Sequence, residues 1–72
     1  MKNVRIKEGA EAHLRSKRYW LNAWDDLQVD GSSGTVVQNY LDITEYPHYE
    51  VELSELGINI GISPDWLEEI SP

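Results

Sequence analysis

The feature that most constrains the fold is an alternating stretch, YEVEL, near the middle of the chain. On a β-strand its apolar residues Tyr49, Val51 and Leu53 would lie on one face, with Glu50 and Glu52 on the other. This alternation predicts a strand with one side in the core and the other in water. A strand of this kind needs hydrogen-bonded neighbours, so the surrounding sequence must supply a sheet.

A second strand is predicted immediately before this one. The β-branched residues in the segment 35–40 favour extended backbone, and the polar run 42–48, which contains a proline, would end the strand. Residues 34–53 are therefore predicted to form a β-hairpin. A turn is predicted in front of it, since Gly31 and Gly34 bracket two serines and can both adopt positive φ.

Shorter alternating segments lie outside the hairpin. They predict a strand in 1–7, a strand over 11–15 in which Ala12 and Leu14 point inward, and a strand over 58–62. Ala and Leu also favour helices, so the prediction of a strand over 11–15 depends on the alternation alone.

Two further segments are predicted to be helical. Near 17–27, four apolar residues follow the spacing of an amphipathic helix, with a long folded-back loop as the alternative. These residues are Trp20, Leu21, Trp24 and Leu27. Near 64–67, Ser63 followed by Pro64 is typical of an N-cap and the first residue of a one-turn helix.

The chain has 72 residues and no cysteine, so disulfides cannot support its small core. A single domain, 1–72, is expected. No run approaches the ~20 apolar residues of a membrane span, and no N-terminal apolar segment resembles a signal peptide. These features predict a cytoplasmic protein that does not enter a membrane.

Charge is divided unevenly along the chain. All six Lys and Arg residues lie in the first eighteen positions, whereas eleven of the thirteen Asp and Glu residues follow them, and the net charge is −7. One interpretation is that the basic N-terminal segment pairs with acidic neighbours in the folded protein or in a homodimer. The other is a basic arm for nucleic acid, which the acidic remainder would oppose, so nucleic acid is not the favoured partner.

Taken in order, the segments GTVV, YEVEL, INIGI and DWLEEI resemble the small SH3-like barrels, and the resemblance covers nearly the whole chain. It implies a mainly β barrel of about five strands that serves as a scaffold for protein docking. The ALYDY-like segment and the tryptophan that opens the third strand of signalling SH3 domains are missing here, which weakens an interpretation as a binder of proline-rich peptides. By analogy with that family, Trp20, Trp24 and Pro64 would form an aromatic groove.

No motif for catalysis or for a metal is complete. The segment that begins at Asp26 matches the start of a calcium loop, but its twelfth position is Val37 instead of a bidentate glutamate. His13 and His48 are the only histidines, and the sequence has no nucleophile elbow. We therefore predict neither an enzyme nor a bound metal or cofactor.

The function expected from these features is that of a small non-catalytic protein-interaction module, or of an accessory or regulatory subunit. Aromatic side chains dominate many protein interfaces, and four of them are candidate partner-binding residues. They are Tyr19, Trp20, Trp24 and Tyr46. A competing interpretation makes the two tryptophans a lid over the core. Functional alternatives are an acidic inhibitor that mimics nucleic acid and a weak nucleic-acid binder that uses residues 2–18.

Overall fold

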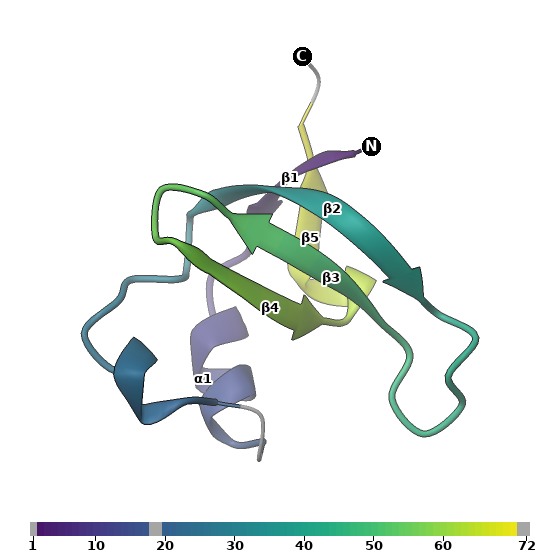
Figure 1. Ribbon diagram of the computed structural model, residues 1–72, viewed down its shortest axis with the longest axis horizontal. Helices are drawn as coiled ribbons and strands as arrows, with labels where there is room; N and C mark the ends of the chain where they lie inside the picture. The colour runs from purple at the N-terminus through teal and green to yellow at the C-terminus, as the bar shows by residue number, and fades with distance from the viewer. Residues whose placement is uncertain (1, 18–19, 71–72) are drawn as a thin grey trace.

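The described residues, 2–17 and 20–70 of the computed structural model, form five antiparallel strands in one sheet (Figure 1). The strands are β1 (Asn3–Ile6), β2 (Ser33–Tyr40), β3 (His48–Leu53), β4 (Ile58–Ile62) and β5 (Leu67–Glu69). Their order in the sheet is β4-β3-β2-β1-β5. The prediction of a mainly β fold with about five strands is confirmed, and the arrangement is consistent with a small β-barrel.

The helical elements are short. They are the helix α1 (Ala10–Arg15) and the 3-10 turns η1 (Asn22–Trp24) and η2 (Pro64–Trp66). The turn η2 is the predicted one-turn helix, and the Ser63 hydroxyl caps it by accepting the N–H of Asp65 at 3.3 Å. Within the described residues, no helix is long and apolar enough to cross a membrane.

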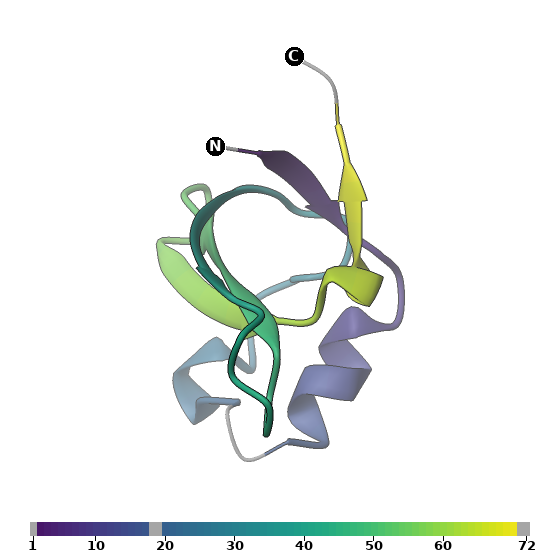
Figure 2. The same ribbon diagram turned by 90° about the vertical axis from the view of Figure 1, so that its right-hand side faces the viewer.

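The predicted hairpin forms the middle of the sheet. β2 and β3 pair antiparallel, with Thr35 opposite Glu52 and Val36 opposite Val51. A register shift between Val36 and Gln38 marks a β-bulge, which increases the local twist of the strand. The twisted sheet curls round on itself, so that β1 and β5 face β3 and β4 (Figure 2).

The hydrophobic core lies inside this curled sheet. Among the described residues, every buried side chain is apolar. The buried residues are Val4, Ile6, Ala10, Leu14, Val29, Val51, Leu53, Ile60 and Ile62. Burial alternates along β3 and β4, as the sequence pattern predicts, because every second residue of these strands points inward.

The prediction of a strand over 11–15 is wrong, because this segment belongs to the helix α1. The residues that α1 buries are Ala10 and Leu14, four positions apart on one helical face, while Ala12 is exposed. Gly9 precedes the helix in a left-handed conformation, with φ of 93°. Five residues can satisfy both a period of two and a helical turn, so contacts from elsewhere in the chain decide between strand and helix.

The segment 17–27 is a loop that contains the single 3-10 turn η1, in the part that the structure describes. Of the two alternatives offered by the sequence, a short helix and a long loop, the loop is therefore the one observed. The apolar residues do not share one buried face. Leu21 is exposed, whereas Trp20 and Trp24 pack against the core.

The two glycines of the predicted turn have different roles. Gly31 has φ of 82°, as predicted for a turn that needs positive φ. Gly34 is the second residue of β2, opposite Val4 of β1, and its φ is not positive. A β carbon at Gly34 would lie 2.7 Å from the carbonyl oxygen of Glu52. Gly34 is therefore required by the close approach of two strands.

Candidate functional site

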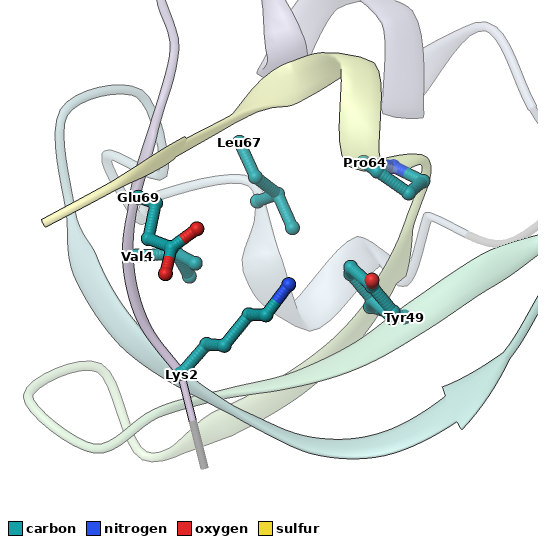
Figure 3. Close-up of a pocket in the computed structure, with 6 residues that line it drawn as sticks. All are labelled: Lys2, Val4, Tyr49, Pro64, Leu67 and Glu69. Atoms are coloured by element: carbon teal, nitrogen blue, oxygen red, sulfur yellow. The ribbon is translucent and has the colours of Figure 1, made fainter.

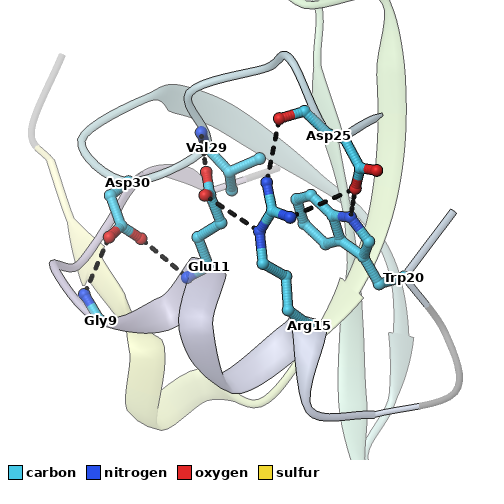
Figure 4. Close-up of polar contacts among 7 residues, drawn as sticks. All are labelled: Gly9, Glu11, Arg15, Trp20, Asp25, Val29 and Asp30. Atoms are coloured by element: carbon cyan, nitrogen blue, oxygen red, sulfur yellow. Dashed lines mark hydrogen bonds and ion pairs between the residues drawn. The ribbon is translucent and has the colours of Figure 1, made fainter. Parts of the chain in front are cut away.

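A network of polar contacts fastens the loop before β2 to the helix α1 (Figure 4). Oε1 of Glu11 accepts the backbone N–H of Val29 at 3.0 Å. Oε2 of Glu11 accepts the Nε–H of Arg15, one helical turn away, at 3.2 Å. Val29 is the residue of this loop that is fully buried in the core, and Glu11 holds its backbone in place.

Asp30 caps the N-terminus of α1 from the end of the same loop. Its Oδ1 accepts the N–H of Glu11 at 2.8 Å, and its Oδ2 accepts the N–H of Gly9 at 3.0 Å. Gly9 occupies the N-cap position and has no side chain that could accept these hydrogen bonds. The cap of this helix is therefore a tertiary contact.

Replacement of Asp30 by alanine should lower the free energy of unfolding by about 1–2 kcal/mol, because two N–H groups lose their acceptor. Urea unfolding followed by tryptophan fluorescence measures this loss. Asp26 is an exposed carboxylate in the same loop. Its replacement by alanine should change the free energy of unfolding by less than about 0.5 kcal/mol. Equal losses in the two variants would show that Asp30 acts through its charge and does not cap α1.

The loop also carries the two tryptophans, which the structure brings together. Their ring centroids are 5.4 Å apart, in an edge-to-face arrangement with an angle of 88°. The guanidinium of Arg15 lies 4.5 Å from the ring centroid of Trp20, and the indole N–H of Trp20 donates to Oδ1 of Asp25 at 2.8 Å (Figure 4). Both rings are half-buried and pack against the core. Trp20 and Trp24 thus support the fold on one side and reach the surface on the other.

Arg15 and Asp25 fix the position of residues 20–27, which we call the tryptophan loop. Nη1 of Arg15 donates to Oδ1 of Asp25 at 3.2 Å, and Nη2 donates to the backbone carbonyl of Asp25 at 3.0 Å. Leu21, at the start of η1, is 54% exposed, the highest value for a large apolar side chain among the described residues. A loop that is fixed to α1 therefore presents an exposed aliphatic side chain at the residue that follows Trp20.

The other two candidate binding residues are placed differently. Tyr19 lies outside the described residues. Tyr46 lies in the loop between β2 and β3, which is at the opposite end of the molecule from η1 in Figure 1. The Tyr46 ring stacks on His48 with 4.7 Å between centroids, and its hydroxyl donates to the carbonyl of Gly61 at 2.8 Å. These contacts attach Tyr46 to β3 and β4.

A small pocket opens between β1, β3 and β5 (Figure 3). Its volume is about 130 Å³. It is lined by Lys2, Val4, Tyr49, Pro64, Leu67 and Glu69. The Lys2 ammonium lies 5.9 Å from the centroid of the Tyr49 ring. Pro64 lines this pocket, whereas Trp20 and Trp24, the other two residues of the expected groove, do not.

Sequence reasoning missed two exposed apolar residues in the loop between β2 and β3. They are Leu41 and Ile43, which are 40% and 42% exposed. The polarity of the segment 42–48 concealed Ile43, and Leu41 lies between this segment and the predicted strand 35–40. The signal that could have found Ile43 is its position as a lone aliphatic residue in a segment that is otherwise predicted to be a polar loop.

Arg5 and Arg15, in the basic N-terminal segment, pair with acidic residues, which agrees with the first interpretation of the charge pattern. Nη1 of Arg5 lies 3.3 Å from Oε1 of Glu68, its partner across β1 and β5. Arg15 pairs with Glu11 and with Asp25. In contrast, the segment 33–62 has five Asp and Glu residues and no Lys or Arg. The strands β2, β3 and β4 and their loops therefore contribute only negative charge.

No group of three or more His, Asp or Glu side chains within the described residues is arranged to hold a metal ion.

Comparison of the chain with known protein families, with curated proteins and with solved structures finds no match. The fold defines the class, a small, mainly β, barrel-like protein. The tryptophan loop and the loop between β2 and β3 carry the exposed large apolar side chains of the described surface.

Proposed function

We propose that this chain is a small non-catalytic protein-interaction module, acting as an accessory or regulatory subunit, that binds a protein partner through the tryptophan loop. The observation that supports the proposal is the 54% exposure of Leu21 in the same loop that holds the edge-to-face pair of Trp20 and Trp24. Aromatic side chains are enriched at the centre of protein interfaces, where charged residues are depleted.

The tryptophan loop is suited to binding because its side chains are already held in place, so a partner would have to immobilise few of them. Trp20 is already held by its hydrogen bond to Asp25 and by the guanidinium of Arg15. A binding event that must immobilise a flexible side chain loses roughly 0.5–1.5 kcal/mol for each one. Leu21 supplies the exposed contact, and the accessible parts of the two tryptophans extend the apolar surface.

Replacement of Leu21 by aspartate should weaken partner binding by at least about tenfold, because the interface would have to bury an unpaired charge. The fold should be unaffected, since Leu21 is exposed. The partner is recovered from the native host with the tagged wild-type protein, and its Kd is then measured for both proteins. Trp20 and Trp24 are less suitable for this test because both pack against the core.

A matched control introduces the same charge elsewhere. Ala12 is exposed on α1, and the Ala12→Asp variant should bind the partner as the wild type does. Thermal unfolding of both variants verifies that they are folded. Unchanged binding by the Leu21→Asp variant would exclude the tryptophan loop as the binding surface. Recovery of a second copy of the chain would identify the partner as a homodimer subunit.

A second candidate function is that of an acidic inhibitor that mimics nucleic acid. The observation that favours it is the segment 33–62, with its five acidic residues and no Lys or Arg. The partner in that case would be a basic nucleic-acid-binding protein, and DNA or RNA would compete with this chain for it. Competition by nucleic acid therefore distinguishes the two functions.

A further inference from the structure

The loop between β2 and β3, residues 41–47, carries two exposed large apolar side chains. Leu41 and Ile43 are two positions apart and are 40% and 42% exposed. They are two of the three exposed large apolar side chains in the described part of the chain. Exposed apolar side chains that are grouped and bordered by polar residues mark interaction sites.

Local hydrogen bonds hold the start of this loop. The N–H of Leu41 donates to Oδ1 of Asn39 at 2.9 Å. The N–H of Ile43 donates to the carbonyl of Tyr40 at 3.2 Å and closes a turn. The backbone N–H groups of both exposed residues are therefore fixed by partners at the end of β2.

A cluster of three rings anchors both ends of the loop. Tyr40, at the end of β2, lies with its ring centroid 5.1 Å from that of His48 in β3. Tyr46, which precedes β3, stacks on the same His48 at 4.7 Å and donates to the carbonyl of Gly61 at 2.8 Å. The loop leaves and re-enters the sheet at this cluster, so its two ends are held in place before any partner binds.

The charged side chains within the loop have one sign. Asp42 and Glu45 are exposed within it. The nearest sequence neighbours with charge, Glu50 and Glu52 on β3, are also acidic, and no Lys or Arg occurs anywhere in 33–62. Such a surface attracts cationic groups and repels phosphates.

We propose that the loop 41–47 is a docking site for a cationic protein segment that carries aliphatic side chains. Aliphatic side chains of the segment would contact Leu41 and Ile43, and its Lys or Arg side chains would pair with Asp42 and Glu45. This inference goes beyond the proposed function, because it concerns a different surface and specifies the chemistry of its partner.

The proposal is tested with a short labelled peptide in which leucine and lysine alternate, using fluorescence anisotropy with the whole chain. The Leu41→Ser/Ile43→Ser variant should bind this peptide at least about tenfold more weakly than the wild type. A peptide in which serine replaces leucine should bind the wild type as weakly. Equal binding of the two peptides, or of the two proteins, would overturn the proposal.

The role of the loop carboxylates is tested with two variants of equal net charge. Asp42→Asn/Glu45→Gln should weaken binding of the leucine–lysine peptide and reduce its dependence on salt. Glu8→Gln/Glu55→Gln removes the same charge from exposed positions away from the loop and should bind almost as the wild type does. Equal weakening by the two variants would show that the peptide responds to net charge alone and would overturn the proposal.

The Leu21→Asp variant separates this proposal from the proposed function. It should bind the leucine–lysine peptide as the wild type does, even if it has lost the partner of the tryptophan loop. Loss of peptide binding in this variant would place the peptide on the tryptophan loop and overturn the proposal. If the Leu41→Ser/Ile43→Ser variant proves unfolded, the two charge variants decide, since they remove no apolar side chain.

Discussion

Replacement of Gly34 by alanine should lower the free energy of unfolding by about 3 kcal/mol. The added β carbon would lie 2.7 Å from the carbonyl oxygen of Glu52, from Cδ2 of Leu53 and from Cγ1 of Val51. The carbonyl belongs to the backbone of β3, so it can move away only if β2 and β3 separate. Urea unfolding measures the loss, and Tm should fall by roughly 4–8 °C for each kcal/mol.

Gly57 provides the matched control for Gly34. Its φ is 70°, and nothing lies within 4 Å of a β carbon built there. The Gly57→Ala variant should therefore lose only the cost of a left-handed backbone, about 1–2 kcal/mol. A Gly34→Ala variant that is as stable as the wild type would contradict the close approach of β2 and β3.

Replacement of Leu53 by alanine should lower the free energy of unfolding by about 3–4 kcal/mol. Leu53 is fully buried at the end of β3 and belongs to the core cluster. The loss combines the transfer of its side chain from water with the cavity that the truncation leaves. A fold of this size is expected to have a total stability of about 4–11 kcal/mol, so a large share of it would be removed. Thermal and urea unfolding both report the change.

The same Leu→Ala replacement at Leu41 shows whether the loss of stability at Leu53 comes from its packing in the core or from the loss of a leucine side chain as such. Leu41 is 40% exposed in the loop between β2 and β3, so the Leu41→Ala variant should change the free energy of unfolding by less than about 0.5 kcal/mol. Similar losses at Leu41 and Leu53 would show that Leu41 contributes to the core as Leu53 does. That result would also weaken the case for a docking surface at this loop.

The elements that the sequence predicts correctly have local determinants. The hairpin 34–53 and the strand β4 are predicted from alternating apolar residues. Such alternation identifies a strand with one buried face without any knowledge of which residues cover that face. The turn η2 follows from Ser63 and Pro64, whose hydroxyl and fixed φ act on their immediate neighbours.

The candidate site was only partly visible in the sequence. Residue type alone points to Trp20 and Trp24, but their burial depends on whether other elements cover them. The structure shows both rings half-buried against the core, with Arg15 beside Trp20. The two tryptophans therefore cover part of the core with one side of the pair, and the other side is accessible to a partner.

By itself, the sequence determined the strands of the hairpin and of β4, the turn at Gly31 and the short helical turn at η2, because these depend on residues adjacent in the chain. Only the tertiary structure decided that 11–15 belongs to a helix. That helix takes its N-terminal cap from Asp30, and Glu11 ties it to the loop at Val29. Likewise, Gly34 is needed because the backbone of another strand occupies the space of a side chain. Contacts between residues far apart in the sequence leave no periodic pattern, so sequence reasoning cannot predict them.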